Sequence, residues 1–84
     1  MRILFADQGW EDFAYWIEHD RKIAQRIVRL IREIPRRPFE GIGKPEPLKH
    51  DFAGFWSRRI TEEHRLVYAV EKDSILIAQA RYHY

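Results

Sequence analysis

Hydrophobic positions in the first half of the chain recur with the period of an α-helix. In the first such segment, Trp10, Phe13, Ala14 and Ile17 stand at positions i, i+3, i+4 and i+7. This spacing places them on one face of a helix, and we expect that face to join the core. Asp7 stands before the segment and is of a residue type that caps helix N-termini, so it is the predicted N-cap.

A second helix is predicted between Asp20 and Pro35. Its apolar stripe has the same spacing and consists of Ile23, Ile27, Leu30, Ile31 and Ile34. Pro35 ends the helix because a proline disfavours helical conformation at the residue before it. The short link between the two segments, together with their two apolar faces, predicts a helical hairpin.

Strand-like segments flank this hairpin, and they are rich in β-branched and aromatic residues. The predicted strands are residues 2–6, 55–60, 64–70 and 75–82. Short polar turns join the last three, which predicts antiparallel pairing. A strand, two helices and a strand meander define an α+β fold in which the helices cover one face of the sheet and leave the other open. The 84 residues are expected to form a single domain, 1–84.

Residues 36–51 show no periodicity. Their backbone is restricted by Pro38, Gly41, Gly43, Pro45 and Pro47. Irregular segments of this length in compact domains are usually functional or disordered. The prolines, together with the apolar side chain of Phe39, favour an ordered loop that docks on the rest of the chain.

The cysteine content, the hydropathy and the charge of the chain indicate its compartment and limit its partners. The chain has no cysteine, and no stretch approaches the roughly 18 apolar residues that span a membrane. We therefore expect a soluble, cytoplasmic protein without thiolate metal sites and without a membrane partner. The formal net charge is only +2, yet residues 36–59 hold six basic and three acidic side chains. That local excess is compatible with a polyanionic partner.

Most familiar enzyme motifs are absent from the sequence. No glycine-rich phosphate loop precedes a helix, neither serine lies in a nucleophile elbow, and the four histidines lack metal-ligand spacing. No metal and no cofactor is therefore expected. What remains is a scatter of charged residues on the irregular loop and the strands, including Glu46, Arg58, Arg59, Arg65 and His83.

Three of these residues supply what RNA cleavage requires. RNA carries its own nucleophile, the 2′-OH, so a protein needs to add a base, an acid and a cation that stabilises charge on the phosphate. Glu46 is the candidate base, His83 the candidate acid and Arg65 the candidate cation. An acid and a base each contribute about 10²–10⁴-fold in rate, and one electrostatic contact contributes about 10²–10³-fold. From the residues alone, an RNA-binding module without turnover stays an alternative.

Four stretches are the most distinctive in the chain: GKPEPLKH (residues 43–50), GFWSRRI (54–60), EEHRLVY (62–68) and RYHY (81–84). At these spacings they resemble the YoeB toxins, which belong to the RelE-type toxins of bacterial toxin–antitoxin pairs. The resemblance covers essentially the whole chain and is weaker across residues 3–34 and 51–53. It implies a twisted, largely antiparallel sheet with a two-helix hairpin packed on one face, as in RelE-type toxins and microbial ribonucleases.

The resemblance also implies an activity, which is metal-independent cleavage of mRNA in the ribosomal A site. The expected products are a 2′,3′-cyclic phosphate, or its 3′-phosphate, and a 5′-hydroxyl. The matching positions are Glu46 as general base, His83 as general acid, Arg65 as the transition-state arginine, Tyr84 as a substrate-positioning residue, and Lys49 and Arg59 as contacts to phosphate or ribosomal RNA.

The resemblance implies partners as well: the ribosome and mRNA, a YefM-like antitoxin whose flexible segment covers the basic site, and a second copy in a homodimer. A RelE-type inhibitor without catalysis is the other alternative, although such relatives generally lack the Glu, Arg and terminal His-Tyr set.

The catalytic hypothesis requires Arg65 and His83 to lie on the same face of the sheet. Side chains alternate along a strand, so Arg65 and His83 share a face of a regular hairpin only if the connecting loop has an odd number of residues. An even-numbered loop requires a β-bulge between them.

Overall fold

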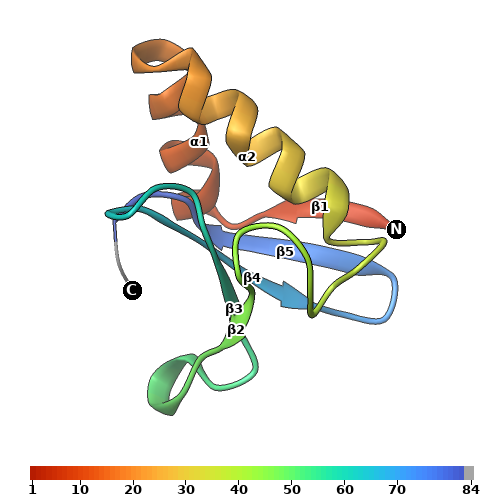
Figure 1. Cartoon of the computed structure of the whole chain (residues 1–84). Helices are drawn as coiled ribbons and strands as arrows, with labels where there is room; N and C mark the ends of the chain where they lie inside the picture. The colour runs from red at the N-terminus through yellow and green to blue at the C-terminus, as the bar shows by residue number, and fades with distance from the viewer. Residues whose placement is uncertain (83–84) are drawn as a thin grey trace.

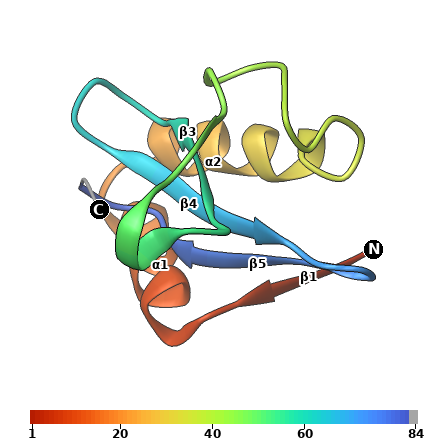
Figure 2. The ribbon, with the colours of Figure 1, turned by 90° about the horizontal axis from the view of Figure 1, so that it is seen from below.

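Five strands form one sheet, and two helices pack on one of its faces (Figures 1 and 2). The computed structural model describes residues 1–82. Its elements are β1 (Arg2–Phe5), α1 (Asp7–His19), α2 (Arg21–Glu33), β2 (Glu46–Pro47), the 3₁₀ turn η1 (His50–Phe52), β3 (Trp56–Arg59), β4 (Arg65–Val70) and β5 (Ser74–Gln79). The strand order is β1-β5-β4-β3-β2. Only the β1–β5 pair is parallel, so the predicted α+β fold with a largely antiparallel sheet is confirmed.

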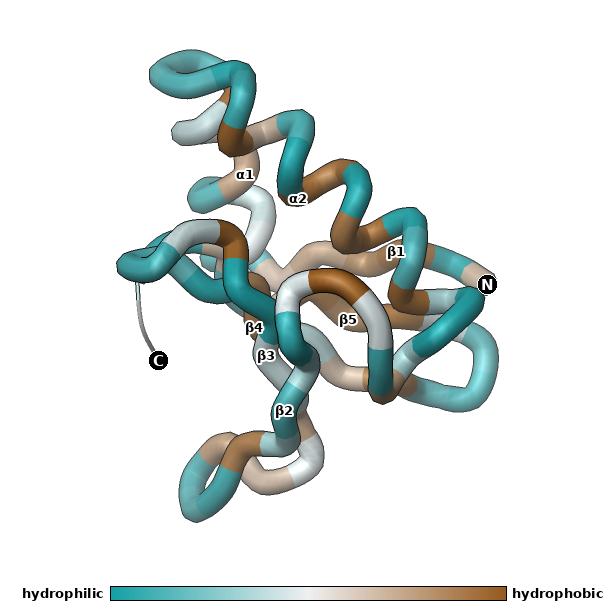
Figure 3. The backbone as a smooth tube through the Cα atoms, in the orientation of Figure 1, coloured by the Kyte–Doolittle hydropathy of each residue, from teal (hydrophilic) through white to brown (hydrophobic). Residues whose placement is uncertain are grey.

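The predicted stripe of α2 forms the centre of the core. Ile27, Leu30 and Ile34 have no solvent exposure, and they pack in one cluster with Tyr68 and Ile77 of the sheet. Each fully buried aliphatic side chain contributes about 1.5–3 kcal/mol through removal from water. Apolar and polar residues alternate along α2 in Figure 3, as an amphipathic helix requires. The helix also begins where predicted, because the Asp20 side chain accepts a hydrogen bond from the Ile23 N–H at 3.3 Å.

The predicted inward face of α1 is confirmed at Phe13, which is partly buried and packs against the core, and is wrong at Trp10 and Ile17. Trp10 is 51% exposed and Ile17 is 41% exposed, whereas Gly9, Asp12 and Trp16 are buried. Gly9 decides the orientation, since a Cβ there would lie 2.3 Å from the carbonyl oxygen of Ile77. The helix therefore rests its glycine on β5, and polar partners elsewhere in the chain satisfy the buried Asp12 and Trp16.

The start of α1 also differs from the prediction by one residue. Ala6 occupies the N-cap position with extended backbone, and no side chain caps the helix. Asp7 is the first helical residue, where its negative charge still interacts favourably with the helix dipole.

A buried arginine orders the irregular loop. Arg58 has no exposed surface, and its guanidinium donates to Tyr68 Oη and Glu33 Oε1. It also donates to three loop carbonyls, those of Arg37, Glu40 and Ile42. These contacts use all five guanidinium N–H groups, which are the whole donor capacity of arginine. The loop is thus ordered and docked, as its prolines predicted.

The same network attaches the loop to α2. The Glu33 carboxylate accepts from Arg58 at 2.8 Å and from the Ile42 N–H at 2.8 Å. Hydrogen bonding from Arg58 is the main cause that lowers the pKa of Glu33, and the Ile42 N–H adds to it. Tyr68 in turn donates to the Pro38 carbonyl at 2.8 Å. The loop therefore leaves α2 and reaches β2 along a fixed path. None of the helices within residues 1–82 is long and apolar enough to cross a membrane.

Candidate active site

Three of the candidate residues, Glu46, Arg59 and Arg65, lie on the sheet face that the helices leave open. Strand alternation sends Trp56 and Arg58 toward the helices, and Ser57 and Arg59 toward the other side. Arg58 is therefore not part of a site with Arg59: it lies on the opposite face, buried in the network that orders the loop.

Glu46 and Arg65 meet on this open face. Glu46 lies in β2 opposite Ser57 of β3, and Arg65 opens β4. Arg65 Nη1 is 3.5 Å from Glu46 Oε1, with the arginine side chain 14% and the carboxylate 54% exposed. A largely covered cation thus stands beside an exposed carboxylate, although the two residues are far apart in sequence.

Polar atoms beneath this pair have spare hydrogen-bonding capacity. Within residues 1–82, Arg65 Nε and Ser57 Oγ are buried and have no hydrogen-bond partner. Buried polar groups are ordinarily paired, and a catalytic or binding role is one explanation for an unpaired one. Sequence reasoning did not include Ser57. Only part of the signal was in the sequence: Ser57 shares its parity with Arg59 in β3, whereas its place opposite Glu46 depends on the β2–β3 register.

Arg59 adds a second cation to the face. It pairs with Arg65 across β3 and β4, so two like charges stand on neighbouring strands. Such a pair is unfavourable for folding, and Glu46 offsets only part of it. The exposed Arg59 is fixed by its backbone: its N–H donates to the Gly43 carbonyl at 2.7 Å, and its carbonyl accepts from Arg26 at 3.2 Å. Two neighbouring guanidinium groups, those of Arg59 and Arg65, form a surface that favours binding of an anion such as phosphate.

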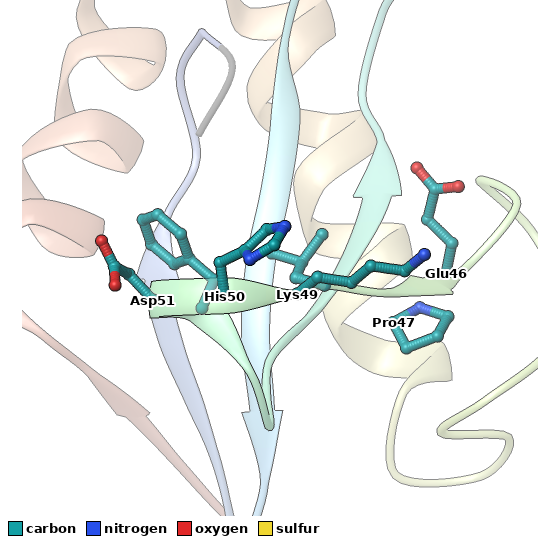
Figure 4. A pocket seen from close by; sticks show the side chains of 7 residues that line it. Glu46, Pro47, Lys49, His50 and Asp51 are labelled. Atoms are coloured by element: carbon teal, nitrogen blue, oxygen red, sulfur yellow. The ribbon is translucent and has the colours of Figure 1, made fainter.

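Lys49 lies in a pocket that opens beside Glu46. The pocket is lined by Glu46, Pro47, Leu48, Lys49, His50, Asp51 and Phe52, and Lys49 extends along it toward Glu46 (Figure 4). The segment turns sharply because His50 adopts a left-handed backbone conformation, with φ of 58°. Leu48 is buried and anchors the segment, leaving the charged side chains at the surface. Within residues 1–82, no group of three or more His, Asp or Glu side chains is placed to hold a metal ion.

His83 and Tyr84, the predicted acid and substrate-positioning residue, lie outside the described residues. The chain is described up to Tyr82, whose carbonyl accepts a hydrogen bond from the Arg65 N–H at 3.1 Å. The residue before His83 is therefore at the start of β4, beside the Arg65 backbone.

The hairpin of β4 and β5 contains a bulge. Val70 pairs with Ile75, and the four residues between them make an even-numbered connection. The register shifts between Val67 and Tyr68, so Val67 pairs with Gln79. The irregularity that an even-numbered connection calls for is thus present, and it turns Gln79 to the face that carries Arg65.

At the level of fold, the chain is similar to a solved structure with low sequence identity. YafQ from Escherichia coli superposes with a TM-score of 0.79 over 99% of this chain and 94% of that one, at 15% identity. The family model of YoeB-like toxins of bacterial type II toxin–antitoxin systems matches residues 5–84. The chain belongs to this family, which confirms the resemblance read from the four sequence stretches.

Individual relatives agree with that assignment over their full length. Toxin YoeB of Escherichia coli K12 is 60% identical over 84 residues, which are 100% of both chains. The solved structure of a YoeB/ParE toxin from Agrobacterium tumefaciens has a TM-score of 0.97 at 45% identity, with both chains covered completely. A YoeB dimer and a YoeB–YefM complex from Staphylococcus aureus give TM-scores of 0.93 and 0.92, at 46% and 45% identity, over 100% of this chain and 98% of each of those.

Proposed function

We propose that this toxin inhibits translation by cutting mRNA in the ribosomal A site, without a metal ion. The observation that carries the proposal is the contact between Glu46 and Arg65 on the open face, at 3.5 Å. A carboxylate and a guanidinium are two of the three groups that attack by a 2′-OH needs. Arg59 and Lys49, both exposed nearby, supply further positive charge for an RNA backbone.

The proposed reaction is an internal transfer at phosphorus. Glu46 takes the proton of the 2′-OH as the O2′–P bond forms. Arg65 stabilises the additional negative charge on the phosphate oxygens. His83 donates a proton to O5′ as the P–O5′ bond breaks, while Tyr84 positions the substrate. The products are a 2′,3′-cyclic phosphate, which water can open to a 3′-phosphate, and a 5′-hydroxyl.

The test is primer extension on a message translated in a purified system. We expect Glu46→Gln and His83→Ala each to lower the cleavage rate by about 10²–10⁴-fold, the usual contribution of a base or an acid. Glu18→Gln and His19→Ala are matched controls, because both residues are exposed on α1, which packs on the opposite face of the sheet (Figure 1). Removal of residues 83–84 should leave the circular dichroism spectrum unchanged and abolish cleavage. Full cleavage by that truncated protein would contradict the mechanism.

The same experiment separates the non-catalytic alternatives. A binding module or a pure inhibitor predicts that His83→Ala still blocks translation, whereas the nuclease proposal predicts that inhibition and cleavage fall together. Metal independence is tested with toxin that has been treated with EDTA and desalted, while the ribosomes keep their Mg²⁺. Loss of cleavage that returns with added metal would contradict that part.

The proposed partners follow from relatives of the family. Staphylococcus aureus YoeB forms a complex with YefM and has been solved as a dimer. We propose that this chain binds a YefM-like antitoxin over its basic open face and forms a homodimer. Purification with the product of an adjacent small reading frame tests the first, and sedimentation of the free toxin tests the second.

A further inference from the structure

Side chains from distant parts of the chain hold its described end. Regular pairing of β5 stops at Gln79, yet the backbone beyond it is hydrogen-bonded at both Ala80 and Tyr82. The Ala80 N–H donates to Asp12 Oδ2 at 2.9 Å, and its carbonyl accepts from Trp16 Nε1 at 2.8 Å. The Tyr82 N–H donates to His64 Nδ1 at 2.7 Å. Side chains thus supply three of the hydrogen bonds of this segment, and the Arg65 N–H at the start of β4 supplies a fourth, to the Tyr82 carbonyl.

All three holding side chains are buried and held in turn. Asp12 is 5% exposed, Trp16 7% and His64 9%. Gln8 donates to the other carboxylate oxygen of Asp12 at 2.8 Å, which fixes the carboxylate plane. A carboxylate that accepts a backbone N–H away from water makes a strong, charge-assisted hydrogen bond.

His64 is wedged between two aromatic rings. Its ring centroid lies 4.8 Å from that of Trp16 and 5.0 Å from that of Tyr82. Because the Tyr82 N–H donates to Nδ1, that nitrogen must be unprotonated, and the neutral ring carries its hydrogen on Nε2. His64 is also the residue immediately before Arg65, so one side-chain contact couples the end of the chain to the start of β4.

The conformation at Tyr82 is one that needs support. Its φ is 62°, in the left-handed region that a bulky residue rarely adopts. Such a conformation persists when surrounding contacts determine it. Here the contacts come from both sides of the residue, since the N–H donates to His64 and the carbonyl accepts from the Arg65 N–H.

We propose that Asp12, Trp16 and His64 are positioning residues of this toxin. They fix the backbone from Ala80 to Tyr82 beside the Arg65 N–H, and the catalytic step depends on that placement. The inference rests on the proposed function, in which His83 supplies the acid. Residues of α1 and of the β3–β4 connection thereby affect the chemistry, although α1 packs on the opposite face of the sheet (Figure 1).

The expected consequence is a slower chemical step without weaker binding. A displacement of about 1 Å at a reacting group costs up to about 10²-fold in rate. The basic side chains that would contact RNA, those of Lys49, Arg59 and Arg65, are all retained when His64 is replaced. We therefore expect the saturating cleavage rate to fall by about 10–10²-fold, with the toxin concentration for half-maximal rate unchanged.

The experiment compares His64→Leu with His64→Asn. Leucine fills the space but removes the acceptor, whereas the asparagine oxygen stands where the imidazole carries Nδ1, one bond from Cγ. His19→Leu is the matched control on the exposed part of α1. Single-turnover cleavage on programmed ribosomes is measured at a temperature where circular dichroism shows every variant folded. We expect a slow His64→Leu, recovery in His64→Asn and an unchanged His19→Leu.

Hydrogen exchange of the Tyr82 amide supplies a readout that is independent of activity. It should accelerate in His64→Leu and return toward the wild-type rate in His64→Asn. Asp12→Ala against Asp12→Asn repeats the comparison at the Ala80 amide. Wild-type cleavage and exchange rates in His64→Leu would overturn the positioning role. A wild-type protein that cleaves nothing would overturn the proposed function instead, and the exchange data would still decide whether His64 holds the chain end.

Discussion

Glycine at position 9 lets α1 rest directly on β5. In an isolated helix, Gly→Ala gains about 1 kcal/mol, but here the new Cβ would meet the Ile77 carbonyl oxygen at 2.3 Å. Overpacking of this kind costs about 1–3 kcal/mol. We predict that Gly9→Ala lowers the free energy of unfolding, measured in urea, despite its higher helix propensity. Glu18→Ala, exposed on the same helix, should change it by no more than about 0.5 kcal/mol. A Gly9→Ala protein as stable as wild type would contradict the close approach.

Replacement of Arg58 should lower the stability of the protein, whereas replacement of Arg59 should lower its cleavage activity. Arg58→Met leaves Glu33, Tyr68 and the loop carbonyls without their donor. Loss of one partner in a buried charge network costs about 3–5 kcal/mol. Arg59→Met removes an exposed side chain and should change stability by no more than about 0.5 kcal/mol while reducing cleavage. Thermal unfolding and primer extension on both variants test this, and equal destabilisation by the two would contradict the assignment of Arg58 to the fold.

At the scale of elements, the hydrophobic pattern predicted those helices and strands whose position depends on residues close together in the sequence. The α2 stripe, the start of α2 near Asp20, the strand meander and the two-layer arrangement follow from periodicity and turn residues. The buried face of α1 was not predictable in this way. It depends on a contact between Gly9 and Ile77, and on hydrogen bonds of Asp12 and Trp16 to Ala80, all distant in sequence.

For the candidate site, too, the sequence predicted the residues but not how the strands bring them together. Glu46, Arg59 and Arg65 were selected by residue type and family resemblance, whereas their placement on one face depends on strand alternation and pairing. The parity of β3 separates Arg58 from Arg59, and the register between β2 and β3 places Ser57 opposite Glu46. The sequence did not determine whether the β4–β5 loop has an odd or an even number of residues. The bulge between Val67 and Tyr68 was therefore not predicted, only required if the number was even.

The junction of α2 with the loop should be sensitive to acid. Hydrogen bonds from Arg58 and the Ile42 N–H lower the pKa of Glu33 below its ordinary 4.5. A carboxyl group with a lower pKa in the folded state stabilises that state above its unfolded pKa, and this stabilisation is lost as pH falls through the folded value. We expect the wild-type unfolding free energy to decline more steeply below pH 4.5 than that of Glu33→Gln. Urea titrations at several pH values measure the difference, with the exposed Glu18→Gln as control. Parallel curves for wild type and Glu33→Gln would exclude the ionised Glu33–Arg58 pair as an acid-sensitive anchor.

The whole molecule presents different surfaces at the two edges of its sheet. In the order β1-β5-β4-β3-β2, the edge strand β2 carries Glu46, and β1 forms the other edge. Beside β1, large apolar side chains are exposed: Ile3 at 37%, Leu4 at 41% and Trp10 at 51%. A chain of 84 residues buries a smaller fraction of its surface on folding than a larger domain does, so self-association is a common further source of stability.

We therefore predict that Trp10→Glu dissociates the proposed homodimer. An exposed aromatic ring at the centre of an interface contributes about 2 kcal/mol or more, so the dissociation constant should rise by at least about 30-fold. Sedimentation equilibrium over a range of concentrations measures it, with Ile42→Glu, also exposed but on the loop, as the matched control. Because β1 and β2 are opposite edges, the variant should still cleave RNA at temperatures where it is folded. A Trp10→Glu protein that stays dimeric would place the interface elsewhere, whereas a folded monomer that cannot cleave would mean that the second copy completes the active site.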